Sequence, residues 1–285
     1  MQPTTLPHRP GSGRVAELWV LPEHDVAAVD RALDGDRLLG SAERQQLARL
    51  ALPGARRRFR GGRLLARCAL TAHTGLPLDG WSFTPGRYGR PEPYPAVGPS
   101  VNIAHTDGIV VCVAVRGALA GADVERTPLP QPTAATLVRL LADDEQRWIA
   151  GQPASSRGAA CAAVWVLKEA YLKATGLGLR RRVAAFGCIP DGAGGAVLRD
   201  PELPAAEHGR WRFLLRTRAS GHVVAVAVRT AAAGAVPPEL TEVSLTGFLA
   251  LPSAARAPAP HGAALQGAAL QGVALQDAAL QGAAL

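Results

Sequence analysis

The sequence offers little to build a metal framework, a disulfide framework or a membrane span. Its four cysteines are scattered, and no two of them form a CxxC pair, which fits neither a zinc site nor a small secreted domain. The longest apolar stretch, residues 159–167, is well short of the ~20 residues that cross a bilayer. The opening MQPTTLPHRPGSGR lacks the hydrophobic segment of a secretion signal. We therefore expect a cytoplasmic protein with free, mostly buried thiols and no membrane partner.

Lysine and aromatic residues are also scarce. Only two of the 31 basic residues are lysines, Lys168 and Lys173, and all the others are arginines. Because the two side chains are not interchangeable where geometry is tight, this pair indicates a place that needs a compact ammonium, with chance clustering as the alternative. Aromatic residues make up 5%, which argues against a base-stacking platform for single strands. The net charge of +8 still favours an anionic ligand or partner.

Composition divides the chain into four parts. Residues 1–13 are predicted to be a flexible N-terminus, 14–125 an N-terminal half, and 126–230 a C-terminal half. Residues 231–285 are rich in Ala and Pro and end in GAALQ-like repeats from residue 262. Leucine at every fifth position fits neither a helix nor a strand period, and five pentads are too few to close a pentapeptide-repeat β-helix. We therefore predict a low-complexity tail from residue 231.

Hydrophobic periodicity within the two halves predicts an α+β fold that is loosely duplicated. Each half has helical stretches followed by short strands. Helices are expected from residue 41 onward and at 63–75, 133–150 and 158–175, with a very basic run at 55–63 and a loop-rich segment at 81–99. Strands are expected at 14–21, 101–105, 109–115, 119–125, 183–189, 210–217 and 222–228.

Two acidic residues end one of these strands. Asp123 and Glu125 are separated by one residue, so both carboxylates point to the same side of the strand, while Ala122 and Val124 point to the other. Two adjacent carboxylates repel each other unless a cation or a proton neutralises them. Mg²⁺ would serve, since it takes oxygen ligands. The spacing alone supports a solvated strand end equally well.

A helix and a histidine supply further candidates. Trp165, Glu169 and Lys173 lie four residues apart and therefore share one helix face. An ordinary Glu–Lys pair beside a core tryptophan would explain that spacing, although the scarcity of lysine argues against it. His105 ends the strand expected at 101–105, where it could donate to a phosphate oxygen, but a single histidine is more often structural.

Three sequence blocks contain the candidate residues and follow one another along the chain. They are VNIAHTDG at 101–108, GADVE at 121–125 and WVLKEAYLK at 165–173. Together they resemble the signature of the surfactin-type 4′-phosphopantetheinyl transferases, whose last block reads W-x-x-K-E-A-x-x-K. Upstream, RRRFRGGRLLAR and YGRP resemble family elements more weakly. The resemblance covers roughly residues 14–229.

This resemblance implies a fold and a reaction. The fold would be pseudo-duplicated, each half a helix packed on a small antiparallel sheet, with the active site between the halves. The reaction would move the 4′-phosphopantetheine arm of coenzyme A to a serine of an apo acyl or peptidyl carrier protein. The other product would be adenosine 3′,5′-bisphosphate. Such carriers serve polyketide, nonribosomal peptide and fatty-acid synthesis, and the sequence does not choose among these pathways.

The resemblance also implies catalytic and metal-binding roles. Asp123, Glu125 and Glu169 match the carboxylates that hold Mg²⁺ against the pyrophosphate. Glu169 also matches the base that takes the proton of the carrier serine, directly or through a water. Lys173 matches the lysine that contacts the phosphate under attack, and no role follows for Lys168.

The resemblance implies contacts to coenzyme A for a second set of residues. His105 matches the histidine on the coenzyme A phosphates, and Arg58 an arginine at the 3′-phosphate. Arg44 stands where another 3′-phosphate lysine is common, and Arg90 where a lysine often lies near the adenine and phosphate. Ala104 replaces the usual serine, so one hydroxyl near the phosphate is missing.

Two other classes of function compete with this one. A Mg²⁺-dependent nuclease or other phosphodiester-cleaving enzyme also combines an acidic pair with a Glu and a Lys, and a basic chain suits nucleic acid. A basic binding module without catalysis is the third class. The Trp–Lys–Glu–Ala helix and the upstream histidine block are not expected in either. We therefore expect a monomeric transferase that does not bind nucleic acid.

Overall fold

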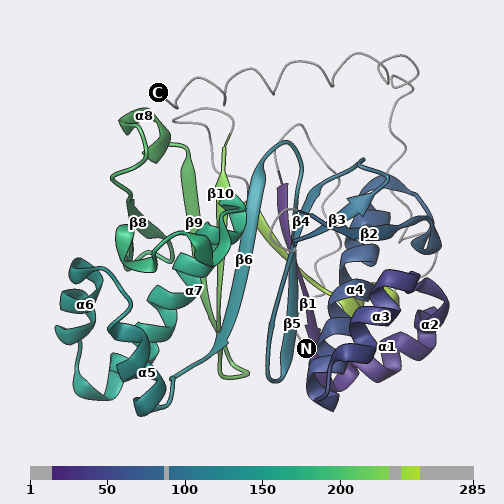
Figure 1. Ribbon diagram of the computed structural model, residues 1–285, viewed down its shortest axis with the longest axis horizontal. Coiled ribbons are helices and arrows are strands. Elements are labelled where there is room, and N and C mark those ends of the chain that lie inside the picture. Colours follow the sequence, from purple (N-terminus) through teal and green to yellow (C-terminus); the bar gives the residue numbers. More distant parts are fainter. Residues whose placement is uncertain (1–14, 87–89, 231–238, 251–285) are drawn as a thin grey trace.

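The computed structural model describes residues 15–86, 90–230 and 239–250, and within them the chain forms two halves. Each half has one long helix packed against antiparallel strands, and the halves stand side by side (Figure 1). The predicted α+β fold with two similar halves is therefore confirmed.

The first half centres on α4, Pro53–Thr74, which packs on a sheet of order β11-β1-β5-β4. A separate β2–β3 hairpin and the short helices α1–α3 surround it. The bounds are β1 Val15–Pro22, α1 Val26–Leu33, α2 Gly35–Leu38, α3 Ser41–Arg49, β2 Ser82–Pro85, β3 Pro91–Tyr94, β4 Ser100–Thr106 and β5 Ile109–Val115.

The second half centres on α7, Arg157–Thr175, which packs on a sheet of order β6-β10-β9. A β7–β8 hairpin and three shorter helices complete it. The bounds are β6 Leu119–Arg126, α5 Gln131–Val138, α6 Asp143–Ala150, β7 Gly187–Pro190, β8 Ala196–Arg199, α8 Ala205–His208, β9 Trp211–Arg218 and β10 His222–Arg229.

Two strands belong to a different part of the fold than the predicted boundaries at residues 125 and 230 imply. β6 ends at the expected boundary between the halves, yet it pairs with β10 in the second sheet. β11, Glu239–Ser244, returns to the first sheet, where it pairs in parallel with β1. The first sheet is therefore mixed rather than purely antiparallel. Local patterning shows where a strand is, but it does not show which distant strand will be its partner.

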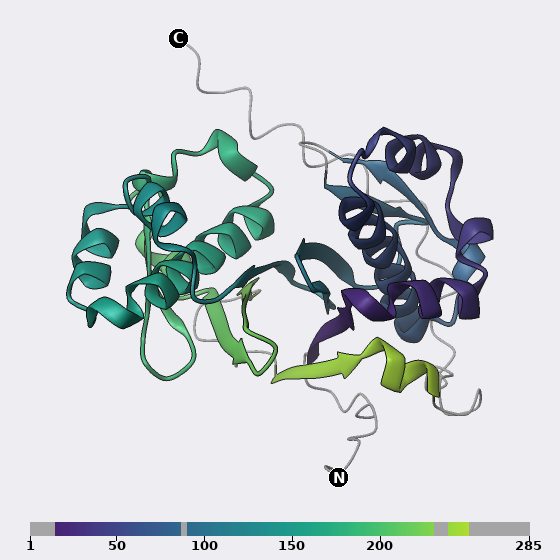
Figure 2. The same ribbon diagram turned by 90° about the horizontal axis from the view of Figure 1, so that it is seen from below.

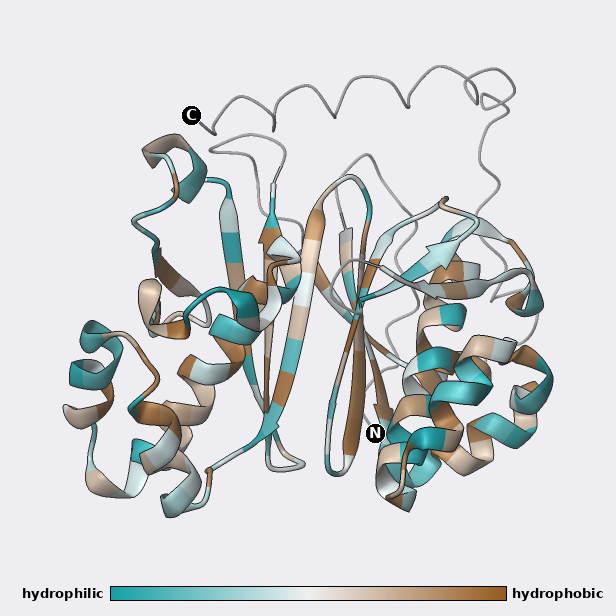
Figure 3. Ribbon diagram, viewed as in Figure 1, coloured by the Kyte–Doolittle hydropathy of each residue, from teal (hydrophilic) through white to brown (hydrophobic). Residues whose placement is uncertain are grey.

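The two sheets pack face to face between α4 and α7, so the central strands are covered on both sides (Figure 2). On β5, Val110, Cys112 and Ala114 join the core under α4. The alternate residues Ile109, Val111, Val113 and Val115 join the core between the sheets. This double burial explains the unbroken apolar run of β5, and hydrophobic residues gather on the central strands in Figure 3.

Three local predictions need correction. The basic run at 55–63 lies inside α4, because arginine is a good helix former and Pro53 suits a first helical turn. The segment expected as one helix at 133–150 is two, because Glu145 accepts a hydrogen bond from the Ala142 N–H (2.9 Å) and so begins α6. The loop-rich segment at 81–99 contains the β2–β3 hairpin.

The prediction of a low-complexity tail from residue 231 is wrong for 239–250. After β11 comes α9, Leu245–Ala250, where the fully buried Leu245 joins the core of the first half. The rings of Phe248 and Trp19 lie 4.9 Å apart. A short edge strand stabilised by pairing with the start of the chain has no local signature. Residues 1–13 and the GAALQ repeats lie outside the described residues.

The thiols follow the sequence-based expectation. All four cysteines are buried and reduced. Within the described ranges, no helix combines the length and the apolarity needed to cross a membrane.

Candidate active site

The predicted acidic pair lies on β6 where this strand runs against α7. A Cβ at Gly121 would lie 2.2 Å from the Ala170 carbonyl oxygen and 2.4 Å from the Ala174 nitrogen. Only glycine allows a strand to approach a helix backbone this closely. Ala122 and Val124 pack between the sheets, as the alternation predicted. The glycine of GADVE, to which the sequence analysis gave no role, therefore brings the strand's carboxylates to α7.

Asp123 and Lys173 form an ion pair at the centre of this contact. The Lys173 Nζ lies 2.5 Å from Asp123 Oδ1, and the two side chains are 28% and 12% exposed. Burial raises the pKa of Asp123 and the neighbouring Glu125 carboxylate adds to the rise, while the Lys173 ammonium opposes it. Two predicted site residues from different elements are thus in direct contact.

Glu169 lies one helical turn before Lys173. Both belong to the half-buried face of α7 that also carries Trp165, as the spacing predicted. Burial raises the pKa of Glu169, repulsion from Asp123 raises it further, and the charge of Lys173 opposes both effects. A carboxylate with a raised pKa is a better proton acceptor than an ordinary glutamate.

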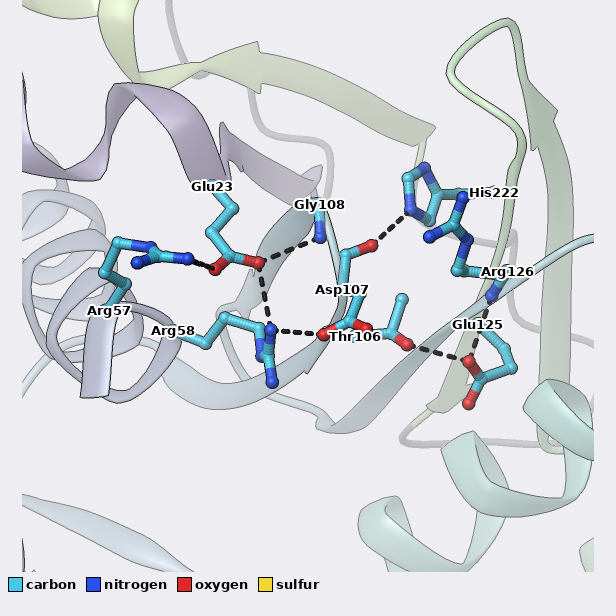
Figure 4. Close-up of polar contacts among 9 residues, drawn as sticks. All are labelled: Glu23, Arg57, Arg58, Thr106, Asp107, Gly108, Glu125, Arg126 and His222. Carbon is cyan, nitrogen blue, oxygen red and sulfur yellow. Dashed lines mark hydrogen bonds and ion pairs between the residues drawn. The ribbon is translucent and has the colours of Figure 1, made fainter. Parts of the chain in front are cut away.

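Glu125 is held by the first half of the molecule. Its Oε1 accepts hydrogen bonds from the Thr106 hydroxyl (2.7 Å) and the Arg126 N–H (3.0 Å) (Figure 4). Nearby, the Ala122 N–H donates to Asn102 Oδ1 over 3.0 Å. Asn102 and Thr106 thus join β4 to β6. Both residues lie in the VNIAHTDG block, although neither was a predicted site residue.

His105 lies in the same electrostatic environment. Although the residue is exposed, partial desolvation of its ring lowers the pKa of His105, and the cationic charges of Arg58 and Lys173 lower it further. A lowered pKa keeps the imidazole neutral near pH 7, with one N–H to donate. A neutral His105 therefore lies in the positive field of Arg58 and Lys173.

Arg58 lies in the first turns of α4. Its Nη1 donates to Glu23 Oε2 over 3.0 Å and also to an oxygen of Asp107. Its buried Nε has no hydrogen-bond partner among the described residues. The side chain is 16% exposed, so Arg58 is fixed on one edge and retains donor capacity.

Arg90 lies between the halves, and its guanidinium already donates three hydrogen bonds within the protein. It donates to the Ser100 hydroxyl (3.0 Å), the Val101 carbonyl (2.8 Å) and the Lys173 carbonyl (3.4 Å). Burial lowers the pKa of Arg90. The observed contacts fasten the start of β4 to the C-terminal end of α7, and contact with an adenine stays a prediction.

Arg44 has different surroundings. It donates to the Leu39 carbonyl and lines a groove of about 450 Å³ between α1, α3 and α4. Asp30 and the arginines Arg56, Arg57 and Arg60 also line this groove. No carboxylate of the Asp123 cluster does so. The structure therefore does not bring Arg44 together with the other predicted residues.

The three predicted metal ligands do not form a coordination sphere. Among the described residues, no group of three or more His, Cys, Asp or Glu side chains is arranged to hold a metal ion. Instead, the Lys173 ammonium donates to Asp123, and the Thr106 hydroxyl donates to Glu125. The donor set nevertheless fits Mg²⁺, because carboxylate oxygens are its preferred protein ligands and the Lys173 ammonium stands where a cation would neutralise Asp123.

Comparison with known proteins gives a family match over the segment that carries most of these residues. Residues 120–227, which run from β6 into β10, match the family model described as the 4′-phosphopantetheinyl transferase superfamily. This segment, 108 of the 285 residues, is similar to that superfamily. It contains Asp123, Glu125, Glu169 and Lys173, whereas the predicted His105 and three arginines lie upstream. The resemblance read from the three sequence blocks is confirmed.

Individual relatives are distant. The 4′-phosphopantetheinyl transferase gsp of Aneurinibacillus migulanus is 27% identical over 125 residues, which is 44% of this chain and 51% of that protein. The chain thus spans about half the length of this curated relative. Among solved structures, the holo-[acyl-carrier-protein] synthase (AcpS) of Thermotoga maritima aligns with a TM-score of 0.31 and 24% identity, over 40% of this chain and 64% of that one.

Proposed function

We propose that this protein is a Mg²⁺-dependent 4′-phosphopantetheinyl transferase of the surfactin type. It transfers the 4′-phosphopantetheine arm of coenzyme A to a serine of an apo acyl or peptidyl carrier protein and releases adenosine 3′,5′-bisphosphate. The observation that carries the proposal is the Asp123–Lys173 ion pair, with Glu169 beside it, inside the segment that matches the superfamily.

The charges around this pair suit a pyrophosphate substrate. Lys173, Arg58 and the N–H of a neutral His105 provide donors for phosphate oxygens. Charge-assisted hydrogen bonds to phosphate are roughly twice as strong as neutral ones. The net charge of +8 also suits the acidic surface on which carrier proteins present their serine.

Transfer makes one P–O bond and breaks another. The carrier serine oxygen bonds to the phosphorus that carries the pantetheine, and the bond from this phosphorus to the bridging oxygen breaks, so the electron pair leaves with adenosine 3′,5′-bisphosphate. Glu169 takes the serine proton, directly or through a water, and its raised pKa suits that role. Lys173 orients and neutralises the phosphate under attack.

Asp123, Glu125 and Glu169 would hold the Mg²⁺ ion. When bound, Mg²⁺ polarises the phosphoryl group and offsets the charge of the leaving phosphate. The Lys173 ammonium also contacts Asp123, and the Thr106 hydroxyl donates to Glu125. Both contacts limit the repulsion within the acidic cluster.

Incubation with coenzyme A, Mg²⁺ and a panel of apo carriers tests the function. We expect the mass of at least one carrier to increase by one phosphopantetheine group, with adenosine 3′,5′-bisphosphate as the second product. Polyketide, nonribosomal peptide and fatty-acid carriers in the panel would identify the pathway. Cleavage of nucleic acid in a parallel assay, with all carriers unmodified, would instead favour the nuclease.

The metal requirement is tested on the same reaction. Asp123→Ala should lower turnover by orders of magnitude, with at most partial rescue by high Mg²⁺, because it removes a predicted ligand and the partner of Lys173. Asp79→Ala, which removes a half-exposed carboxylate near Arg37, is the control and should keep normal turnover. Full activity in excess chelator, or in the Asp123→Ala protein, would contradict the assignment.

A further inference from the structure

The turn between β4 and β5 receives hydrogen bonds from both halves of the molecule, and Glu23 makes two of them. Glu23 begins the 3₁₀ turn Glu23–Asp25 that follows β1. Its backbone N–H donates to the Gly108 carbonyl (2.9 Å), and its Oε2 accepts the Gly108 N–H (2.9 Å) (Figure 4). One residue therefore binds both backbone groups of Gly108, whose φ of +93° suits only glycine.

The same carboxylate binds two arginines of α4. Glu23 Oε1 accepts a hydrogen bond from Arg57 Nε over 3.1 Å and lies 3.0 Å from Arg57 Nη2 in an ion pair. Oε2 lies 3.0 Å from Arg58 Nη1. The side chains of Glu23 and Arg58 are 9% and 16% exposed, so their bond is shielded from water, whereas Arg57 is 53% exposed. Burial tends to raise the pKa of Glu23, but the Gly108 N–H and the arginines outweigh burial and lower it, so the group is ionised.

Arg58 itself contacts the turn through Asp107, whose side chain is 68% exposed. From the other half, the ring of His222 hydrogen bonds to the Asp107 carbonyl oxygen over 2.8 Å. Glu23, Arg58 and the turn thus form a closed set of contacts. His105, which lies in the field of Arg58 and Lys173, is two residues before Asp107 in the chain.

We infer that Glu23 is a positioning residue for coenzyme A binding: it orients Arg58 and fixes the turn that follows His105. The inference rests on the proposed function. Glu23 touches no reacting atom and acts through Arg58 and the Asp107–Gly108 turn. An arginine held at one edge by a buried carboxylate loses little conformational freedom when its remaining donors meet a phosphate.

The direction in which the affinity for coenzyme A changes, when the charge of Glu23 is removed, distinguishes positioning from simple electrostatics. A carboxylate beside a phosphate site repels the ligand. If Glu23 were only a counter-charge, removing its charge would therefore tighten coenzyme A binding. If it positions Arg58 and the turn, the same change weakens binding, because two arginines become free to take other rotamers.

Equilibrium binding of coenzyme A, measured by calorimetry on the full chain without a carrier, is the test. Glu23→Gln keeps the size of the side chain and an oxygen for Gly108, but it puts an amide against Arg58. We expect Kd to rise about tenfold. In steady state, KM for coenzyme A should rise while kcat stays within about threefold, as for lost binding without lost chemistry. Kd unchanged or lowered would overturn the inference.

A control and a second variant keep the test decisive. Asp36→Asn also removes a carboxylate paired with an arginine of α4, since Asp36 Oδ1 lies 2.6 Å from Arg60 Nη2, and Kd should stay within about twofold of wild type. If Glu23→Gln fails to fold, the exposed Asp107→Asn removes the second anchor of Arg58, and Kd should rise about threefold. An unchanged or lowered Kd in that variant would equally overturn the inference.

The proposed function can fail separately. If the wild-type protein binds coenzyme A but modifies no apo carrier, the transferase assignment is wrong while the effect of Glu23 is still measurable. If the wild-type protein does not bind coenzyme A at all, both are wrong.

Discussion

At the scale of single residues, the two lysines have very different partners. Lys168 is fully buried, and its Nζ lies 2.8 Å from both carboxylate oxygens of Glu145. It also donates to the Phe186 carbonyl and lies 4.1 Å from the centroid of the Phe186 ring. Glu145 is satisfied further by the Cys188 N–H at 2.7 Å. A compact ammonium fits this site, so the residue whose role the sequence left open joins α7 to α6 and β7.

Lys168→Met should therefore destabilise the protein strongly. Removing one partner of a buried pair leaves an uncompensated charge and costs about 3–5 kcal/mol. The midpoint of urea unfolding measures this loss. Arg199→Met is the matched control, because it breaks a solvent-exposed pair with Asp144 and should cost less than about 1 kcal/mol. Equal midpoints for the two variants would show that Lys168 is not the structural residue described here.

Lys173, in contrast, is partly exposed, and its ammonium contacts the acidic cluster through Asp123. If its ammonium serves one phosphate oxygen, the bulkier guanidinium of Lys173→Arg should misplace the phosphoryl group. A misplacement of about 1 Å can cost on the order of 100-fold in rate. Transfer to an apo carrier should fall sharply while the melting temperature stays nearly unchanged. Near-normal transfer would mean that Lys173 is only one end of a structural ion pair with Asp123.

At the scale of helices and strands, the sequence predicts elements well where burial dictates the pattern. The run of β5 and the helix face shared by Trp165, Glu169 and Lys173 were both predictable, because covered strands and half-buried helices have simple periods. The start of α6 was missed because the capping role of Glu145 was overlooked. The close approach of β6 to α7 was also missed, since it depends on a single glycine whose purpose appears only in three dimensions.

Gly121→Ala tests that approach. The new Cβ would overlap the Ala170 carbonyl oxygen at 2.2 Å, so β6 must move away from α7. We expect a loss of about 1–3 kcal/mol from overpacking. Transfer should decrease more than stability would explain, because Asp123 moves with the strand. Chemical unfolding and carrier modification measure the two effects.

Gly151→Ala is the control for this substitution. Its φ is −70°, and a Cβ there would lie 3.5 Å from the nearest backbone oxygens, an ordinary contact. Its stability should stay within about 0.5 kcal/mol of wild type. If Gly121→Ala behaved like this control in both assays, the close packing of β6 on α7 would not be what places Asp123.

At the scale of the whole molecule, the sequence predicts two halves but not how they interlock. The family blocks located Asp123, Glu169 and Lys173, which the structure brings together. They did not reveal that Asn102 would tie the sheets, because a buried side-chain bond to a distant strand has no periodic signature. Composition was equally misleading at β11 and α9, where pairing with β1 rather than local propensity decides the structure.

The end of the chain provides the sharpest test of this interlocking. A chain ending at Ala250 keeps β11 and α9 and should unfold at the same urea concentration as the full chain. A chain ending at Thr230 loses the parallel partner of β1 and the side chains of Leu245 and Phe248. Each large apolar side chain no longer buried costs about 1.5–3 kcal/mol, and Trp19, now 1% exposed, would lose its ring contact.

We therefore expect the shorter chain to unfold at clearly lower urea. It should also tend to aggregate, because β1 would become an unpaired edge strand. Unfolding of both truncations at the concentration of the full chain would show that residues 239–250 contribute nothing to stability and that the tail begins at residue 231 after all. Loss of soluble expression in the chain ending at Ala250 would show instead that the GAALQ segment belongs to the folded protein.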